Sequence, residues 1–362
     1  MDLKKTPLID EHERLGAKLA PFGGWLMPIQ YSGIIAEHLW TRDEASLFDI
    51  CHMGEFMVRG DAEKSGLNKI VTFDLNTLPI GGCRYGFILN DAGGIIDDLI
   101  VYRIAGSEWM VVVNAATIDR DEAHFRKHLS PDTDLKNVSS ELGKLDLQGP
   151  RSLKILTGIA GSDVAKLGYY TFGYFNLLGE KVIISRTGYT GELGYELYIS
   201  NDKVKHLWKQ LLSDARVKPA GLGARDTLRL EMSYPLYGQD LTEDTTPIEA
   251  DKGRFVDLKK DFIGKAALLK NNKPYRRLIN FISRSRRSPR HNYRIFSNGK
   301  DIGVVTSGSF SPSLSCGIGM GYVDTPCAPG SEIALKENNI EIPAIVTKGP
   351  FYKNGTAKAS EA

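Results

Sequence analysis

Apolar and polar residues alternate along three short segments between residues 85 and 114, and turn-forming residues separate the segments. A period of two predicts β-strands at 85–90, 95–104 and 109–114. The residues that follow predict a helix over 117–129. This part of the chain is therefore expected to form an antiparallel meander followed by a helix.

The middle predicted strand contains two adjacent aspartates, Asp97 and Asp98. Aspartate is depleted in strands, and a buried carboxylate is unfavourable unless it is paired or protonated. Successive side chains of a strand point to opposite faces, so Asp98 shares a face with Tyr102 while Asp97 shares the other face with Arg103. Arg103 is thus available to pair with Asp97, which indicates a structural role for Asp97 and leaves Asp98 among apolar and aromatic neighbours.

The four-residue turn at 91–94 predicts the register of the first hairpin. Pairing Asn90 with Ile95 across this turn sets Phe87 opposite Asp98. Tyr85 then lies diagonally from Asp98 on the same face. The first two strands therefore place an aromatic side chain beside the carboxyl group.

Asp98 has three predicted neighbours, Tyr85, Tyr102 and Asn114. The second turn brings Asn114 to the level of Asp98 or Leu99, which differ by one residue of register. A carboxyl group in such a setting can have a raised pKa and can serve as a general base or anchor a ligand nitrogen. A tyrosine-lined pocket suits a flat heteroaromatic ligand. The residues themselves thus predict a site at Asp98 for a planar, nitrogen-rich ligand.

The remaining pattern predicts further strands and helices. Ser32 is expected to cap a helix that runs to about Leu47 with Ile35, Leu39 and Trp40 in the core. Between residues 140 and 255 strands and helices alternate. Four predicted strands near the C-terminal end indicate a small antiparallel barrel or sandwich. The other expected strands are 55–58, 144–148, around 172 and 183, 302–307, 316–322, 332–335 and 342–346, and the other expected helices are 62–70, 150–156, 204–213 and 224–232.

Two glycine-rich stretches interrupt this pattern. Residues 185–196 join two predicted strands through three glycines, which indicates either close approach of the backbone to a ligand or a plain hairpin. Residues 220–226 enter a helix without a clear preceding strand and form neither a dinucleotide fingerprint nor a phosphate loop. Arg225 in the first turn opposes the helix dipole, so we expect an anionic partner for it unless its side chain is simply exposed.

The histidines do not predict a metal centre. His52 follows a strand without a second ligand at suitable spacing, so a satisfied or solvent-facing side chain is the better interpretation. His124 and His128 are four residues apart, but no third ligand is evident and a solvated basic face is expected. No metal is therefore predicted.

Composition excludes several classes of protein. The 362 residues carry a net charge of +2, which gives no overall attraction to nucleic acid or membrane, and no apolar run has the 18 or so residues of a membrane helix. Four scattered cysteines and the absence of an N-terminal signal core favour a cytoplasmic protein. The arginine-rich segment 273–294 has little aromatic interleaving, so a solvated connector is expected rather than an RNA site.

Seven motifs, in order along the chain from about Thr6 to Phe351, resemble those of the glycine cleavage system T-protein family, the aminomethyltransferases. The motifs are residues 48–55, 93–102, 112–114, 147–150, 186–196, 221–226 and 237–240. The resemblance implies that an aminomethyl group on the lipoyl sulfur of a partner H-protein gives its methylene carbon to tetrahydrofolate, with release of ammonia. Lipoate then belongs to the partner, and tetrahydrofolate is the acceptor substrate.

The resemblance also implies roles for particular residues. Asp98 would hold the folate nitrogen N10 and raise its nucleophilicity, and Arg225 would lie near Asp98. Glu196 would accept paired hydrogen bonds from the amino-pyrimidinone edge of the pterin. The other residues implied to line the folate pocket are Met53, Tyr85, Tyr102, Asn114, Tyr169 and Tyr189.

The fold implied by the resemblance is α+β, with three domains. Two intertwined antiparallel-sheet domains with helices would surround a central folate channel, and a C-terminal β barrel would follow. The implied domains are residues 1–50 with 140–255, residues 51–139 and residues 273–362. Lys353 departs from the arginine found in many members of the family, which puts one folate contact in doubt.

Two other functions fit parts of the sequence. A tetrahydrofolate-dependent demethylase or C1 transferase on the same scaffold would need no H-protein. A non-catalytic folate-binding assembly factor would carry a Lys-Gly-Cys-Tyr-x-Gly-Gln-Glu motif, which this chain lacks. The basic residues Arg284, Arg286 and Arg287 are expected to meet the acidic H-protein or the polyglutamate tail of folate.

Overall fold

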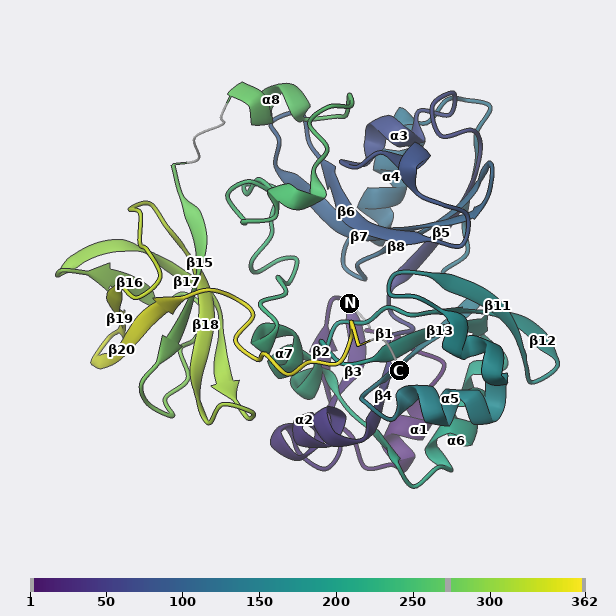
Figure 1. Ribbon diagram of the computed structural model, residues 1–362, viewed down its shortest axis with the longest axis horizontal. Helices are drawn as coiled ribbons and strands as arrows, with labels where there is room; N and C mark the ends of the chain where they lie inside the picture. The colour runs from purple at the N-terminus through teal and green to yellow at the C-terminus, as the bar shows by residue number, and fades with distance from the viewer. Residues whose placement is uncertain (1–2, 271–274, 360–362) are drawn as a thin grey trace.

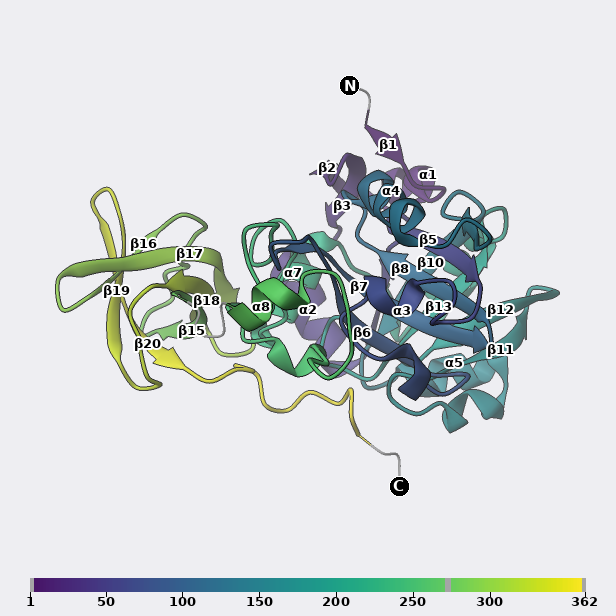
Figure 2. The same cartoon turned by 90° about the horizontal axis from the view of Figure 1, so that it is seen from above.

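The computed structural model describes residues 3–270 and 275–359 and shows a mixed α+β protein, as the family resemblance implies. Two sheets lie side by side at one end of the molecule, and a closed barrel forms the other end (Figure 1). The barrel is seen again at one end from above, with the last described residues running from it along the body (Figure 2).

The predicted meander is part of a five-stranded sheet with the order β6-β7-β8-β5-β9. Apolar side chains such as Leu99 and Val111 pack on one face beneath helix α4, where Phe125 is fully buried. The strands are β5 (Gly54–Arg59), β6 (Cys83–Leu89), β7 (Ile95–Ala105), β8 (Glu108–Val113) and β9 (Asp134–Asn137), with helices α3 (Leu67–Ile70) and α4 (Ile118–His128). The helix expected over 62–70 is shorter, since Gly66 precedes it in a left-handed conformation.

The register of β6 and β7 is the predicted one at the site and differs at the turn. Phe87 lies opposite Asp98. A bulge between Ile88 and Leu89 makes Leu89 the partner of Ile95, in place of the predicted Asn90. The bulge also brings Ile95 into the buried apolar cluster that contains Phe87 and Leu89. The regular alternation of side chains, which was expected from Ile95 onward, therefore begins only at Asp97.

A six-stranded sheet with the order β11-β12-β13-β10-β4-β14 combines early and late parts of the chain. Its strands are β4 (Ala45–Asp49), β10 (Leu142–Gln148), β11 (Phe172–Leu177), β12 (Glu180–Ser185), β13 (Gly194–Ser200) and β14 (Val217–Pro219), covered by α5 (Ser152–Ala160) and α6 (Val204–Leu212). A small sheet of β1 (Lys4–Lys5), β2 (Lys18–Phe22) and β3 (Trp25–Gln30) with α1 (Ile9–Arg14) adjoins it. On this pairing of β4 with β10 and β14 we propose that residues 1–50 and 140–255 form one domain and residues 51–139 a second.

Helix α2 (Ile34–Asp43) corrects two predictions. It ends before β4, so the helix does not reach Leu47. Ile35 and Leu39 are 49% and 46% exposed, and the buried face of α2 is polar. The reason is that Glu37 accepts hydrogen bonds from three backbone N–H groups at 31–33, and this requires its side chain to turn inward.

The C-terminal part is a closed barrel with the order β15-β18-β17-β16-β19-β20. Its strands are β15 (Arg277–Ser283), β16 (Arg294–Ser297), β17 (Lys300–Ser311), β18 (Cys316–Val323), β19 (Glu332–Glu337) and β20 (Ile340–Thr347), and α8 (Lys265–Lys270) precedes them. The predicted solvated connector is wrong over Arg277–Ser283, which form the first barrel strand, whereas residues 284–293 are a largely exposed connection to β16, as predicted. The connector's predicted start at Lys273 lies outside the described residues.

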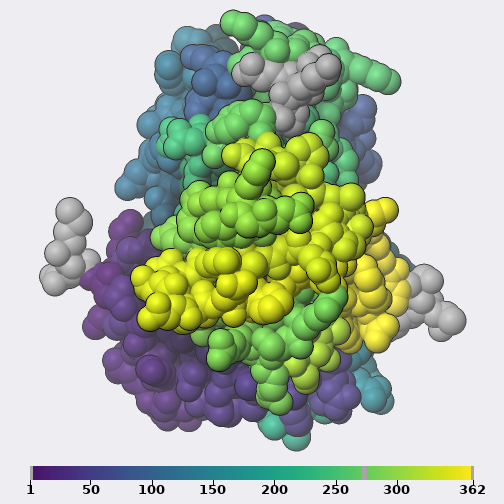
Figure 3. All heavy atoms as spheres, turned by 90° about the vertical axis from the view of Figure 1, so that its left-hand side faces the viewer, coloured from purple at the N-terminus to yellow at the C-terminus, as the bar shows by residue number. Residues whose placement is uncertain are grey.

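The barrel contacts the body through helix α7 (Leu222–Glu231). Arg229 of α7 is 1% exposed and donates to Asp240 and, in β17, to Ser307. Seen from the barrel end, the barrel and the last described residues lie between the meander domain and the N-terminal residues (Figure 3). The contact of Arg229 with Asp240 and Ser307 thus fixes the barrel beside the region where the two sheets meet.

Candidate functional site

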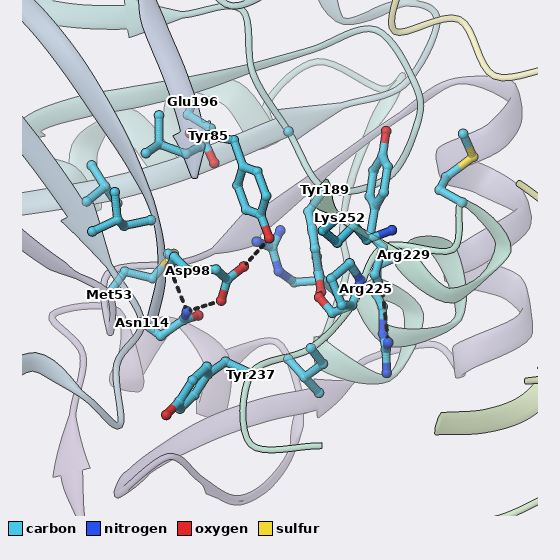
Figure 4. Close-up of a pocket in the computed structure, with 18 of the residues that line it drawn as sticks. Met53, Tyr85, Asp98, Asn114, Tyr189, Glu196, Arg225, Arg229, Tyr237 and Lys252 are labelled. Carbon is cyan, nitrogen blue, oxygen red and sulfur yellow. Dashed lines mark hydrogen bonds between the residues drawn. The ribbon is translucent and has the colours of Figure 1, made fainter. Parts of the chain in front are cut away.

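A cavity of about 1500 Å³ lies between the two sheets and α7. Side chains from β6, β7 and β8 form one wall, and residues 188–191 with the first half of α7 form another. Figure 4 shows Tyr85, Asp98 and Asn114 on one side of this cavity and Tyr189, Arg225 and Arg229 on the other. The cavity therefore joins segments that are distant in the sequence.

Asp98 is half-buried in the cavity wall and has a hydrogen-bond donor on each carboxylate oxygen. The hydroxyl group of Tyr85 donates to Oδ2 at 2.9 Å, and Nδ2 of Asn114 donates to Oδ1 at 2.9 Å (Figure 4). Burial and the neighbouring charge of Asp97 raise the pKa of Asp98 to about 7. Near neutral pH this group can therefore both accept and release a proton.

Tyr102, the third predicted neighbour, lies elsewhere. Tyr102 is four positions beyond Asp98 along the strand, a distance of about 13 Å at 3.3 Å per residue. Its hydroxyl group is fully buried and contacts Ser185, Tyr198 and Glu196. Tyr102 thus donates a hydrogen bond to Glu196 and does not line the cavity beside Asp98.

Asp97 is fully buried on the opposite face of β7, and its predicted pairing with Arg103 is wrong. Asp97 accepts hydrogen bonds from the backbone N–H and Nδ2 of Asn114 and from Oγ1 of Thr117, at 3.0, 2.8 and 2.8 Å. Arg103 lies six positions further along β7, about 20 Å away at 3.3 Å per residue, and its side chain instead lies over the Trp109 ring and donates to the carbonyl oxygen of Leu78. Neutral donors therefore satisfy Asp97.

Glu196 of β13 lies at another part of the cavity with a buried cation beside it. Its Oε2 accepts a hydrogen bond from Thr187 at 2.8 Å and lies 3.7 Å from Nζ of Lys144. Nζ of Lys144 is also 3.7 Å from the sulfur of Met53, which lines the cavity. Lys144 was not predicted, although alternation along 142–148 puts Lys144 on one face with Asp146 and Gln148, a signal for a polar wall.

Arg225, in the first turn of α7, has the expected anionic partner. Its Nη1 donates to the buried Asp146 at 2.6 Å, and its guanidinium lies 5.0 Å from the centre of the Tyr189 ring. Burial raises the pKa of Asp146 to about 6, although the charge of Arg225 opposes this rise. The alternative of a simply exposed arginine is wrong, and a short strand, β14, does precede this stretch.

The glycine-rich stretch 185–196 approaches the protein's own side chains closely. A Cβ atom at Gly188 or Gly194 would lie within 2.3 Å of the amide group of Gln148. The same loop carries Tyr189, whose ring stacks on Tyr234 at 5.8 Å, and Tyr169 lines the cavity with 37% of its surface exposed. The glycines therefore allow the loop to pack on β10 and form a cavity wall.

His52 is neither satisfied nor solvent-facing, contrary to the prediction. It lines the cavity at 5% exposure, and its Nδ1 has no hydrogen-bond partner among the described residues. Burial lowers its pKa to about 4, so the ring is neutral near neutral pH. It is an available hydrogen-bonding group that the sequence did not distinguish from a core histidine.

The chain after the barrel also reaches the cavity. Residues 355, 357 and 358 line it, and Thr356 donates to Glu192 at 2.5 Å while it accepts from the backbone N–H of Leu193 at 2.8 Å. The backbone N–H of Ala357 donates to Gly191 at 3.0 Å. Lys358, and not the exposed Lys353, is the cation of this segment that lines the cavity.

Across residues 3–270 and 275–359, no cluster of three His, Cys, Asp or Glu side chains is arranged to hold a metal ion. The rings of His124 and His128 lie 4.6 Å apart without a third ligand in this part of the chain. Among the same residues, no helix has the length and apolar character needed to cross a membrane.

Two family descriptions match the chain, the GCVT N-terminal domain over residues 8–260 and the glycine cleavage T-protein C-terminal barrel domain over 276–353. The aminomethyltransferase of Halothermothrix orenii is 48% identical over 356 residues, which cover 96% of this chain and 100% of that protein. That of Thermotoga neapolitana is 40% identical, with 98% and 99% covered. The crystal structure of glycine cleavage system aminomethyltransferase T from Bartonella henselae superposes with a TM-score of 0.92 at 36% identity, covering 98% and 99% of the chains.

Proposed function

This chain belongs to the glycine cleavage T-protein family and is an aminomethyltransferase of the glycine cleavage system, and on that premise we propose that its cavity binds tetrahydrofolate with Asp98 at the reacting nitrogen. The donor is then an aminomethyl group on the lipoyl arm of an H-protein. The methylene carbon forms bonds to the folate nitrogens N5 and N10 as its bonds to the lipoyl sulfur and the amine nitrogen break, which gives 5,10-methylenetetrahydrofolate, ammonia and the dihydrolipoyl thiol of the H-protein. We place this reaction in the cytoplasm, in keeping with the free state of Cys51, Cys83, Cys316 and Cys327.

The observation that carries the proposal is the hydrogen bonding of Asp98. Tyr85 and Asn114 hold its carboxylate from two sides and leave its pKa close to neutral. An arylamine nitrogen is weakly nucleophilic and must lose a proton as it attacks carbon. A carboxylate within hydrogen-bond distance can accept that proton, and a pKa near 7 then allows its release to solvent.

The other residues of the cavity suit a flat ligand with a polar edge. Met53, Tyr169 and Tyr189 supply apolar and aromatic surface, and Glu196 supplies a carboxylate for an edge of N–H groups. Tyr102 would act indirectly, by holding Glu196. Arg225, paired with Asp146, would fix the ring of Tyr189 on the wall opposite Asp98.

A coupled assay tests this proposal. Purified protein is supplied with lipoylated H-protein carrying the aminomethyl group and with tetrahydrofolate, and ammonia release is measured. Asp98→Asn removes the proton acceptor and should lower kcat by about 10² to 10⁴. Asp91→Asn, in the exposed turn of the same hairpin, is the matched control and should retain activity within about twofold.

Three results would contradict the proposal. Full activity in Asp98→Asn would remove the role of Asp98. Methylene transfer from a small methylated amine without H-protein would favour the demethylase. Folate binding without any transfer would favour a non-catalytic binding protein.

A further inference from the structure

A second pair of acids lies directly behind Asp98. Asp121 of α4 is fully buried, and its backbone N–H donates to the carbonyl oxygen of Thr117, whose hydroxyl group donates to Asp97. The carboxyl groups of Asp97 and Asp121 interact with each other. Asp97 and Asp121 are outside the cavity lining, so neither is expected to touch a substrate. Their proximity still requires an explanation, because two buried carboxylates side by side repel each other strongly.

The hydrogen bonds assign one proton to this pair. Asp97 receives three donors, whereas neither oxygen of Asp121 has a donor among the described residues. Thr117 has a single hydroxyl proton, and its hydroxyl oxygen lies 2.8 Å from Oδ2 of Asp97 and 2.9 Å from the carbonyl oxygen of Asn114. A buried carboxylate without donors is very unfavourable, so Asp121 is the protonated partner and donates to Asp97. Burial and the charge of Asp97 accordingly raise the pKa of Asp121 to about 10.

The pair therefore carries one negative charge, and Asn114 connects it to the site. Nδ2 of Asn114 donates to Asp97 at 2.8 Å and to Asp98 at 2.9 Å. Because both neighbours of this amide group are acceptors, its NH₂ group must point toward them. The side chain that orients Asp98 is thus itself held by the charged member of the buried pair.

We propose that Asp97 and Asp121 share one proton and that Asp97 is a positioning residue for Asp98, fixing Asn114 and keeping Asp98 basic through its negative charge. The inference rests on the proposed role of Asp98 as proton acceptor. It explains why two adjacent acids occupy one strand: one faces the substrate, and the other supplies a like charge that makes its neighbour a better base.

Other groups also face Asp98 and contribute to its titration. Tyr85 of β6 hydrogen-bonds to it, and Asp97 of β7 is the neighbouring charge that raises its pKa. From α4, Arg120 donates to the carbonyl oxygen of Ile96 and to Tyr237. Tyr189 and Arg225 face it from the loop and α7. The test therefore changes only the pair and leaves these groups in place.

The pH dependence of kcat/KM separates this role from a purely structural one. Asp97→Asn removes the negative charge next to Asp98, so the acidic limb of the kcat/KM pH profile should move to lower pH by about one unit or more. Asp121→Asn keeps the charge, since its amide still donates to a carboxylate at 97, and the limb should stay near that of the wild type. An unmoved limb in Asp97→Asn, or an equal shift in both variants, would overturn the proposal.

Two further measurements keep the result interpretable. Folding of each variant is checked by thermal unfolding. An infrared difference spectrum, wild type minus Asp121→Asn at about pH 8, well above the ordinary aspartate pKa, should show one positive C=O band of a protonated acid. The partly protonated Glu55 is present in both proteins and cancels. Its absence would overturn the shared proton even if a variant were inactive. If Asp98→Asn retained activity, the proposed function would fail instead, whatever the infrared result.

Discussion

The buried pair of Arg229 and Asp240 gives a quantitative test of how the barrel is attached to the body. Arg229 is 1% exposed and Asp240 is fully buried. Asp240 accepts four hydrogen bonds, from Nη1 of Arg229 at 2.9 Å, Oγ of Ser307 at 2.7 Å, Oγ1 of Thr306 at 2.5 Å and the backbone N–H of Leu236 at 2.9 Å. The perturbation is Asp240→Asn, which keeps the shape and removes the charge.

The expected loss in the free energy of unfolding is a few kcal/mol. Removing one partner of a buried ion pair costs about 3 to 5 kcal/mol, because the other charge stays buried. Alternatively, a hydrogen bond to a charged group contributes about 1 kcal/mol more than one between neutral groups, which gives about 4 kcal/mol for four bonds. Asp226 remains as a partner of Arg229, so the lower half of this range is expected.

Urea unfolding followed by circular dichroism and by tryptophan fluorescence measures this loss. The tryptophans, Trp25, Trp40, Trp109 and Trp208, all precede the barrel, so fluorescence reports the body and circular dichroism the whole chain. Asp301→Asn is the control, since its partner Arg294 is 51% exposed and such pairs contribute at most about 1 kcal/mol. Equal losses in the two variants would refute the reasoning. Recovery in the apolar double variant Arg229→Met with Asp240→Leu would support it.

Two further predictions concern buried positions in the two sheets, Glu55 in β5 and Gly194 in β13. Glu55 is 1% exposed, and burial raises its pKa to about 8, so its protonated form stabilises the fold at low pH and this contribution is lost as pH rises toward 8. Between about pH 5 and pH 8, the free energy of unfolding of the wild type should therefore fall by on the order of 4 kcal/mol relative to that of Glu55→Gln. Melting temperatures that change in parallel for the two proteins across that range would contradict this. Gly194→Ala places a Cβ atom 2.1 Å from the amide of Gln148, so it should lower the free energy of unfolding by about 1 to 3 kcal/mol and weaken folate binding about tenfold or more. Gly158→Ala, with open space around it, is the control and should leave stability unchanged or raise it. Equal effects of the two substitutions would count against the close approach.

The part of the site nearest to Asp98 could be predicted from the sequence. A hairpin with a short turn fixes its own register, so Phe87, Tyr85 and Asn114 were placed correctly from local information. The bulge near the turn did not matter for Asp98, because it lies between Ile88 and the turn. Local pairing therefore predicts neighbours well when strands are consecutive.

Other residues could not be placed in this way. His52, Lys144 and Lys358 line the cavity from three distant parts of the chain, and only the pairing of early with late strands brings them together. Helix α2 misled the prediction because an internal carboxylate, Glu37, replaced an apolar side chain on the buried face. A barrel strand was missed because Arg277 to Ser283 follow a basic stretch that resembles a linker in composition.

The contacts of residues 355–358 have a consequence for synthesis of the chain. A ribosome makes a protein from its N-terminal side, so the cavity wall at 186–193 is made long before the segment that packs against it. The barrel must emerge first, since it lies between the two in the sequence. The cavity therefore reaches its final form only after residue 358 has been made, and nascent chains that stop before residue 355 lack part of its wall.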